Sequence, residues 1–161
     1  MNMFCYQCQE ASKGTGCNVQ GVCGKKPNVA NLQDLLIYSS KGIAEVVTKG
    51  KLDVNSIPEV NHQVITSLFA TITNANFDDN AIEELIRKNI RIRNELKKDL
   101  SIKDLHDAAN FEVNSREKML EKASSVGVLS TKNEDVRSLR EMIVYGVKGM
   151  AAYKEHAVNL G

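Results

Sequence analysis

No cysteine occurs after position 23, although the first 23 residues contain four, at Cys5, Cys8, Cys17 and Cys23. The rest of the chain therefore offers no thiol with which these four could form disulfides across the fold. Cys5 and Cys8 are too close in sequence for an ordinary stabilising bridge, and in a reducing cytosol an even cysteine count is better explained by metal binding. The pattern thus disfavours a disulfide framework.

The sequence also lacks an excess of charge, because its 21 Lys and Arg residues face 20 Asp and Glu residues. A net charge of +1, without a basic run interleaved with aromatics, argues against a nucleic-acid partner. No run approaches the roughly 20 apolar residues that span a bilayer. The first residues, MNMFC, do not resemble a secretory signal. We therefore expect a cytoplasmic protein with neither nucleic acid nor a membrane as partner.

Alternation of apolar and polar residues, the mark of a half-buried strand, is absent as well. Apolar residues instead recur at steps of three and four along the chain after the cysteines. The sequence predicts an all-α fold, in which a cysteine-rich loop at 1–27 precedes a bundle of about five helices at 28–161. The expected helices are 29–49, ended by Gly50; 60 to about Asn74-Ala75-Asn76; 79–100; 114–125; and 133–160.

Two local patterns refine this expectation. Asn114 and Glu117 have the spacing of a capping box and predict the start of the short fourth helix. Gly146 and Gly149 lie inside the last helix, where each costs about 1 kcal/mol of helix propensity relative to alanine. We therefore expect another backbone to pack closely against that helix at these two glycines.

The third predicted helix carries many charged residues, which could form a docking patch or a solvated face. Acidic residues alternate with the basic ones, and this favours the solvated face. The basic residues are Arg87, Lys88, Arg91, Arg93, Lys97 and Lys98, and the acidic ones are Glu83, Glu84 and Glu95.

Four glycines share the N-terminal loop with the cysteines and let its backbone bend tightly, with N–H groups directed at whatever the sulfurs bind. They are Gly14, Gly16, Gly21 and Gly24. Four thiolates can hold a zinc ion or an iron–sulfur cluster. Structural zinc sites usually pair two CxxC segments on short hairpins, whereas the second pair here is Cys17-x5-Cys23 without flanking strands. The spacing favours iron–sulfur and leaves zinc open.

Taken together, these residues resemble the hybrid cluster protein family, also called prismane proteins or hydroxylamine reductases. The likeness runs from Met3 to Gly161. Within it, two connecting segments, residues 51–60 and 99–115, match poorly and look shortened. Its segments are FCYQCQEASKGTGC, GVCGK, NLQDLLIY, LFATITNANFDD and KNEDVRSLREMIVYGVKGMAAYKEHAVNLG.

The resemblance implies that Cys5, Cys8, Cys17 and Cys23 ligate a 4Fe-4S cluster, as in family members with this spacing. Members of the family are about three times longer, and their catalytic hybrid cluster is held by histidine, glutamates and cysteines of later domains. Because no cysteine follows Cys23 here, we expect an N-terminal domain that is inactive alone. It would pass electrons from a donor protein toward the hybrid cluster, where hydroxylamine or nitric oxide is reduced.

Two further expectations follow from the same resemblance. An apolar surface around Val147 and Met150 is expected to meet the later domains, so the chain alone should self-associate. The alternative to the redox domain is a self-sufficient helical module that binds a protein partner and holds zinc structurally at the four cysteines.

Overall fold

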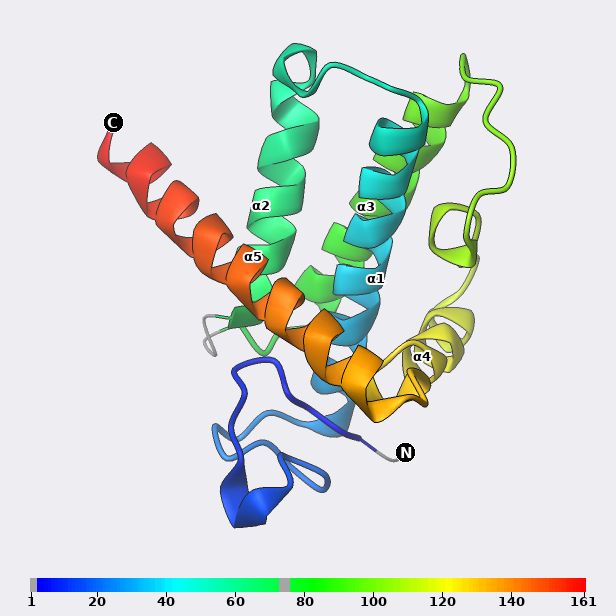
Figure 1. Cartoon of the computed structure of the whole chain (residues 1–161). Helices are drawn as coiled ribbons and strands as arrows, with labels where there is room; N and C mark the ends of the chain where they lie inside the picture. The colour runs from blue at the N-terminus through cyan, green and yellow to red at the C-terminus, as the bar shows by residue number, and fades with distance from the viewer. Residues whose placement is uncertain (1–2, 73–75) are drawn as a thin grey trace.

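The computed structural model describes residues 3–72 and 76–161, and over these residues it is helical and contains no strand. The all-α prediction is therefore confirmed. The helices, shown in Figure 1, are α1 (Pro27–Lys49), α2 (Pro58–Ile72), α3 (Asp79–Lys97), α4 (Arg116–Ser125) and α5 (Glu134–Leu160). In the described residues, one short 3₁₀ turn precedes α1 and three lie between the helices, among them η3 (Asp107–Ala109). None of the described helices is long and apolar enough to cross a membrane.

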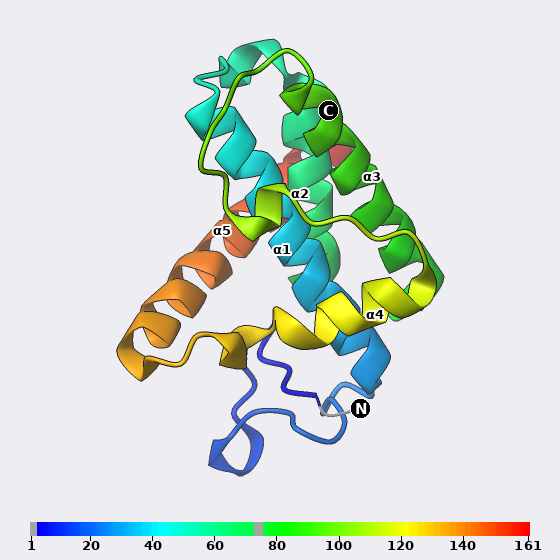
Figure 2. The ribbon, with the colours of Figure 1, turned by 90° about the vertical axis from the view of Figure 1, so that its right-hand side faces the viewer.

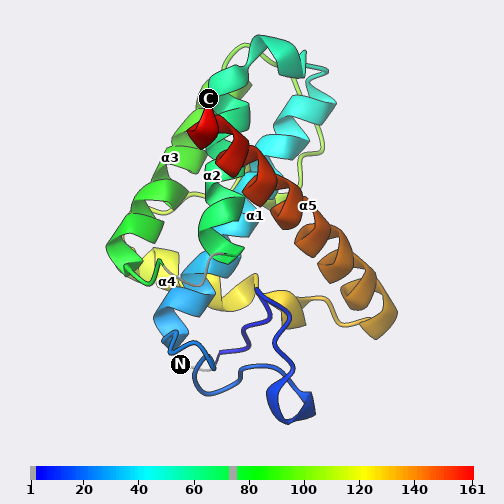
Figure 3. The same cartoon turned by 90° about the vertical axis from the view of Figure 1, so that its left-hand side faces the viewer.

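Helices α1, α2 and α3 lie side by side, and α5 crosses them obliquely with its second half against α2 (Figure 1). Helix α4 packs across the lower part of α1, as Figure 2 shows. The first half of α5 extends away from the other helices (Figure 3). The cysteine loop lies at the lower end, below the first turns of α1, so α1 connects the loop to the core of the bundle.

The core is built around α1, which is covered by other elements on most of its circumference. Its leucines meet the isoleucines of α3 and the apolar side of α4. Burial of this kind contributes about 1.5–3 kcal/mol for each large apolar side chain. The fully covered members are Leu32, Leu35, Leu36, Ile82, Ile86 and Met119.

Local signals in the sequence explain most helix boundaries. Helix α1 begins with Pro27, two residues before the predicted start, and ends before Gly50, as predicted. The side chain of Asp78 accepts hydrogen bonds from the first N–H groups of α3, and Asn133 accepts one from Val136 at the start of α5. The end predicted for α2, at 74–76, lies mostly outside the described residues.

Two boundaries differ from the prediction. The cap of α4 is Ser115, not Asn114, and its hydroxyl accepts from the N–H of Lys118 at 3.2 Å. Helix α3 ends at Lys97 rather than at residue 100, because the N–H of Lys98 bonds three residues back, to Glu95, in a tighter turn. Neither change alters the order or packing of the helices.

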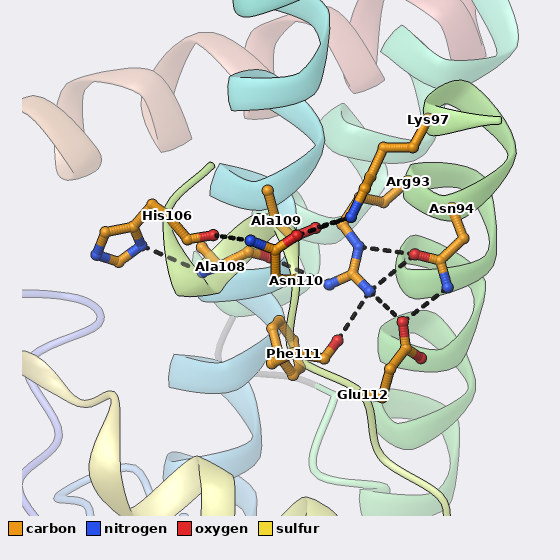
Figure 4. Close-up of polar contacts among 9 residues, drawn as sticks. All are labelled: Arg93, Asn94, Lys97, His106, Ala108, Ala109, Asn110, Phe111 and Glu112. Atoms are coloured by element: carbon orange, nitrogen blue, oxygen red, sulfur yellow. Dashed lines mark hydrogen bonds and ion pairs between the residues drawn. The ribbon is translucent and has the colours of Figure 1, made fainter. Parts of the chain in front are cut away.

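Arg93 was predicted to lie on a solvated face, and this prediction is wrong. Its side chain is 1% exposed, and its guanidinium donates to the carbonyl oxygens of Ala108 (3.2 Å) and Phe111 (2.8 Å) and to Glu112 (2.7 Å), as Figure 4 shows. The segment after α3 folds back over the bundle, and its carbonyl groups have no helical partner there. Arg93 supplies the donors that this segment needs.

The close backbone approach predicted at Gly146 and Gly149 is also wrong for the described residues. A Cβ atom added at either glycine would meet no heavy atom within 4 Å. The close approach occurs at Gly42 in α1 instead, where a Cβ would lie 2.0 Å from the carbonyl oxygen of Ala108 in η3.

Helix α5 carries a largely uncovered apolar face. Val147 is 43% exposed and Met150 is 72% exposed, which confirms the exposed surface predicted around them. The buried residues of α5 are Lys148 and Ala151. The other exposed apolar residues of this face include Leu139, Met142, Ile143 and Tyr153.

Candidate metal centre

The candidate centre is the loop that precedes α1, and a short antiparallel contact closes it. Cys5 donates its N–H to the carbonyl oxygen of Cys17 at 2.8 Å, and Cys17 donates to that of Cys5 at 3.3 Å. Both side chains are buried, whereas Cys8 is half-buried and Cys23 is exposed. All four are free thiols. The contact thus brings together two candidate ligands from opposite halves of the loop.

Glycine is required where the loop bends around the sulfurs. A Cβ at Gly21 would lie 3.1 Å from the sulfur of Cys23 and 3.0 Å from the Cβ of Lys25, closer than ordinary contacts. Gly16 has a φ of +97°, which side-chain-bearing residues rarely adopt, and a Cβ there would lie 3.4 Å from the Phe4 ring. Glycine therefore leaves room beside Cys23, as a cradle for a bulky group on the sulfurs requires.

Hydrogen-bond donors point at two of the sulfurs. The N–H of Val22 lies 3.4 Å from the sulfur of Cys17, and the ammonium of Lys25 lies 3.8 Å from that of Cys5. Lys25 is only 1% exposed, so its charge acts with little screening. Burial raises the pKa of the Cys5 thiol, against the lowering effects of a backbone hydrogen bond from Gln7 and the Lys25 charge. The donors favour the thiolate forms that metals bind.

Among the described residues, no three His, Cys, Asp or Glu side chains are arranged so that they could hold a metal ion. The four candidate ligands therefore do not form a compact site for one ion. The donor set still fits an iron–sulfur cluster, which needs four thiolates, N–H groups near its sulfurs and a partly buried loop. A multi-iron cluster also separates its ligands more widely than a single ion does. The assignment of the four ligands stays a prediction.

The loop is tied to the bundle by three buried polar residues. The side-chain amide of Gln7 donates to a carboxylate oxygen of Asp34 in α1. The ammonium of Lys148 in α5 donates to the side-chain oxygen of Gln7 and, at 3.3 Å, to its backbone oxygen. Burial raises the pKa of Asp34 to about 7 and lowers the pKa of Lys148 to about 8. Gln7 thus fixes the Cys5 to Cys8 segment against two helices.

A cleft of about 580 Å³ opens beside this tie, between α1 and the first half of α5. Cations and carboxylates share its wall, including Lys41, Arg140, Asp34 and Glu141. This mixture of charges does not select a ligand of one sign.

A family comparison agrees with the cysteine pattern and the helical fold. The model of the Prismane/CO dehydrogenase family matches residues 3–161. The chain belongs to this family. The resemblance drawn from the sequence is therefore confirmed, and proteins of the Prismane family carry iron–sulfur clusters.

Curated relatives of this Prismane-family chain are named hydroxylamine reductase, the name of an oxidoreductase. One from Acetivibrio thermocellus is 63% identical over 161 residues, which cover 100% of this chain and 30% of the relative. One from Clostridium perfringens is 50% identical over 168 residues, covering 100% of this chain and 31% of the relative. One from Desulfitobacterium hafniense strain DCB-2 is 51% identical, with 100% and 30% covered. The chain spans less than a third of the length of these relatives.

Sequence reasoning missed the residues that hold the loop of this Prismane-family chain. Lys148 has Val144 four residues before it and Ala151 three residues after it, and both pack in the interface with α2. Helical spacing alone therefore places Lys148 on the packed face of α5. Gln7 gave no comparable signal, because its partners lie 27 and 141 residues away.

Proposed function

We propose that this chain is the N-terminal iron–sulfur domain of a hydroxylamine reductase, with Cys5, Cys8, Cys17 and Cys23 as ligands of a 4Fe-4S cluster. The observation that carries the proposal is the paired, buried contact of Cys5 with Cys17 inside a loop that holds all four free thiols. The family match over residues 3–161 supports it. The loop at 1–27 would hold the cluster, and 28–161 would be its helical support.

The residues of the loop have distinct parts in this proposal. The four thiolates hold the cluster, which supplies one-electron uptake and release at a potential set by its ligands, hydrogen bonds and exposure. Val22 and Lys25 donate toward sulfur and stabilise the negative charge there. Cys23 is exposed, so the side of the loop at Cys23 is within reach of a donor protein. Cys5 and Cys17 lie toward the bundle.

The partners we propose are an electron-donor protein at the loop and the remaining domains of the reductase on the exposed face of α5. Hydroxylamine or nitric oxide would be reduced at a hybrid iron–sulfur–oxygen cluster in those domains, since no cysteine follows Cys23 here. Without these domains, α5 exposes Val147 and Met150, and self-association is the expected result. We place the protein in the cytoplasm, where free thiols are maintained.

Anaerobic reconstitution with iron and sulfide tests the proposal. The loaded protein should be brown and contain about four irons and four sulfides per chain. A colourless protein with one zinc per chain, unable to exchange it for a cluster, would contradict the proposal and favour the structural zinc module.

A second experiment tests the separation of electron transfer from catalysis. The reconstituted chain alone, given a strong artificial electron donor and hydroxylamine, should produce negligible ammonia. Sustained ammonia production by this chain would show that the catalytic centre lies within it and would refute the assigned relay role.

A further inference from the structure

Gln7 occupies a special place, because it lies between the candidate ligands Cys5 and Cys8 and is held by charged groups from two helices. Asp34 of α1 accepts from its amide nitrogen, and Lys148 of α5 donates to its amide oxygen and its backbone oxygen. The exposed fractions of the three residues are 4% for Gln7, 7% for Asp34 and 2% for Lys148. The amide is thus fixed at both ends, and the segment between the two cysteines has one favoured position.

Burying the charge of a lysine to attach the loop to the helices costs free energy. Removing an ammonium from water has an effective penalty of several kcal/mol. An apolar contact or a neutral hydrogen bond could attach the loop without that penalty, since buried ion pairs are often replaceable by apolar residues with no loss of stability. The positive charge of Lys148 therefore calls for an explanation beyond attachment.

The surroundings of the loop supply that explanation. Lys148 and Lys25 are both buried beside the N-terminal segment, and Lys25 contacts the sulfur of Cys5. Charges in a poorly solvated site interact more strongly than charges in water. Lys25 offsets negative charge on the Cys5 thiolate directly. The charge of Lys148 interacts first with the carboxylates of Asp34 and Glu141, and also with Cys5.

We propose that Lys148 is a positioning residue for the cluster loop and also sets its charge balance. Through Gln7 it fixes Cys5 and Cys8 against the bundle, and its ammonium stabilises the more negative, reduced state of the site. This inference rests on the proposed function, because it concerns the loop as the holder of an iron–sulfur cluster. It assigns α5 a part in the site, 141 residues away from Gln7 in sequence.

Four variants separate position from charge. Lys148→Met removes both the hydrogen bonds and the charge, Lys148→Gln keeps a donor without the charge, and Lys148→Arg keeps the charge. Lys154→Met removes an exposed lysine from the same helix and is the matched control. Each protein is reconstituted anaerobically, its iron content is counted, and its midpoint potential is measured by redox titration. Hydrogen exchange of residues 3–26 is compared in the metal-free forms.

The inference predicts a lower midpoint potential in Lys148→Met and Lys148→Gln, and a potential near wild type in Lys148→Arg and Lys154→Met. It also predicts faster exchange of the loop in Lys148→Met, with a smaller change in Lys148→Gln. Should Lys148→Met fail to fold, the Gln and Arg variants still give the comparison of charge. Equal potentials and equal loop exchange across the set would overturn the inference.

The two proposals can fail separately. A wild-type protein that binds no cluster refutes the proposed function, and the exchange of the metal-free loop then still tests the positioning by Lys148. A wild-type protein that binds the cluster, with variants indistinguishable from it, refutes the inference alone.

Discussion

The helical bundle and the cysteine loop of this chain are held in different ways. Leucines of α1 and isoleucines of α3 are completely covered by one another and by α4, and the helices satisfy their own backbone groups. The loop has one small apolar cluster with α1, made by Met3, Cys5, Cys17 and Ala30, and is fixed by polar contacts such as that of Gln7 with Lys148. We therefore expect the bundle to fold without metal and the loop to depend on a ligand for its order.

The largest expected effect is on the loop. Cys17→Ser replaces a buried thiol whose sulfur accepts a hydrogen bond from the N–H of Val22, in a residue whose backbone pairs with that of Cys5. The variant should lose most of the iron that the wild type binds on reconstitution, because an alcohol is a poor ligand compared with a thiolate. Val19→Ser, at a residue 79% exposed in the same loop, is the control and should load normally. Full iron binding by the Cys17 variant would show that Cys17 is not a ligand.

In the bundle, the largest effect should come from Arg93. Arg93→Met leaves the carbonyl groups of Ala108 and Phe111 without their donor. We expect a loss of about 3 kcal/mol in the free energy of unfolding, measured by urea denaturation. Arg91→Met changes an exposed arginine of the same helix and should shift it by less than about 0.5 kcal/mol. Equal effects of the two substitutions would mean that the buried contacts of Arg93 contribute nothing.

Alanine substitutions at two glycines of the bundle should change the stability of the fold in opposite directions. Gly42→Ala forces a methyl group toward the Ala108 carbonyl oxygen and should destabilise the fold by about 1–3 kcal/mol. Gly146→Ala adds a methyl group that meets nothing within 4 Å and should stabilise the fold by about 0.5–1 kcal/mol. The melting temperatures of the two variants check both signs. A destabilised Gly146 variant would restore the close approach that the sequence first suggested.

The smallest expected effect concerns pH and the contact between loop and bundle. Burial raises the pKa of Asp34 from 3.8 to about 7, so the folded state favours its protonated form. Its contribution to stability is fully present below the unfolded pKa and is lost as pH rises through about 7. Asp34→Asn should remove this dependence of the free energy of unfolding on pH, which amounts to less than about 1.4 kcal/mol per pH unit. Urea denaturation between about pH 5 and pH 7 measures it.

Lys148 does not interfere with that measurement. Burial lowers its pKa to about 8, so its own contribution is present above the ordinary value of 10.5 and is lost as pH falls through about 8. The two groups therefore act in different pH ranges. If the free energy of unfolding of Asp34→Asn changes with pH below about 7 as it does in the wild type, Asp34 titrates normally in the folded protein.

Local signals in the sequence predicted the helices well. Helices α1, α3 and α5 begin within two residues of their predicted starts, and α1 ends before Gly50 as expected, because a cap depends on neighbours within a few residues. Arg93 was missed because a charged residue suggests exposure, although it lies three residues after Ile90 on the buried side of α3. Its spacing carried the correct information.

The candidate site was predicted less completely than the helices. The cysteines were evident as candidate ligands from their grouping. The backbone pairing of Cys5 with Cys17, however, depends on how the loop closes. The hydrogen bonds of Gln7 to Asp34 and Lys148 depend on where α1 and α5 lie relative to the loop, which no local pattern encodes. Helical periodicity indicates which face is buried, but not which distant residue it meets.

Hydrogen exchange measured by mass spectrometry on the cluster-loaded and the chelated protein tests the contrast between bundle and loop most directly. Removal of the metal should speed exchange in residues 4–24 and leave α1 and α3 as protected as before, because the core of the bundle does not involve the cysteines. Loss of protection in α1 and α3 together with the loop would contradict the account. It would show that the metal centre holds the whole fold together, as in small zinc domains.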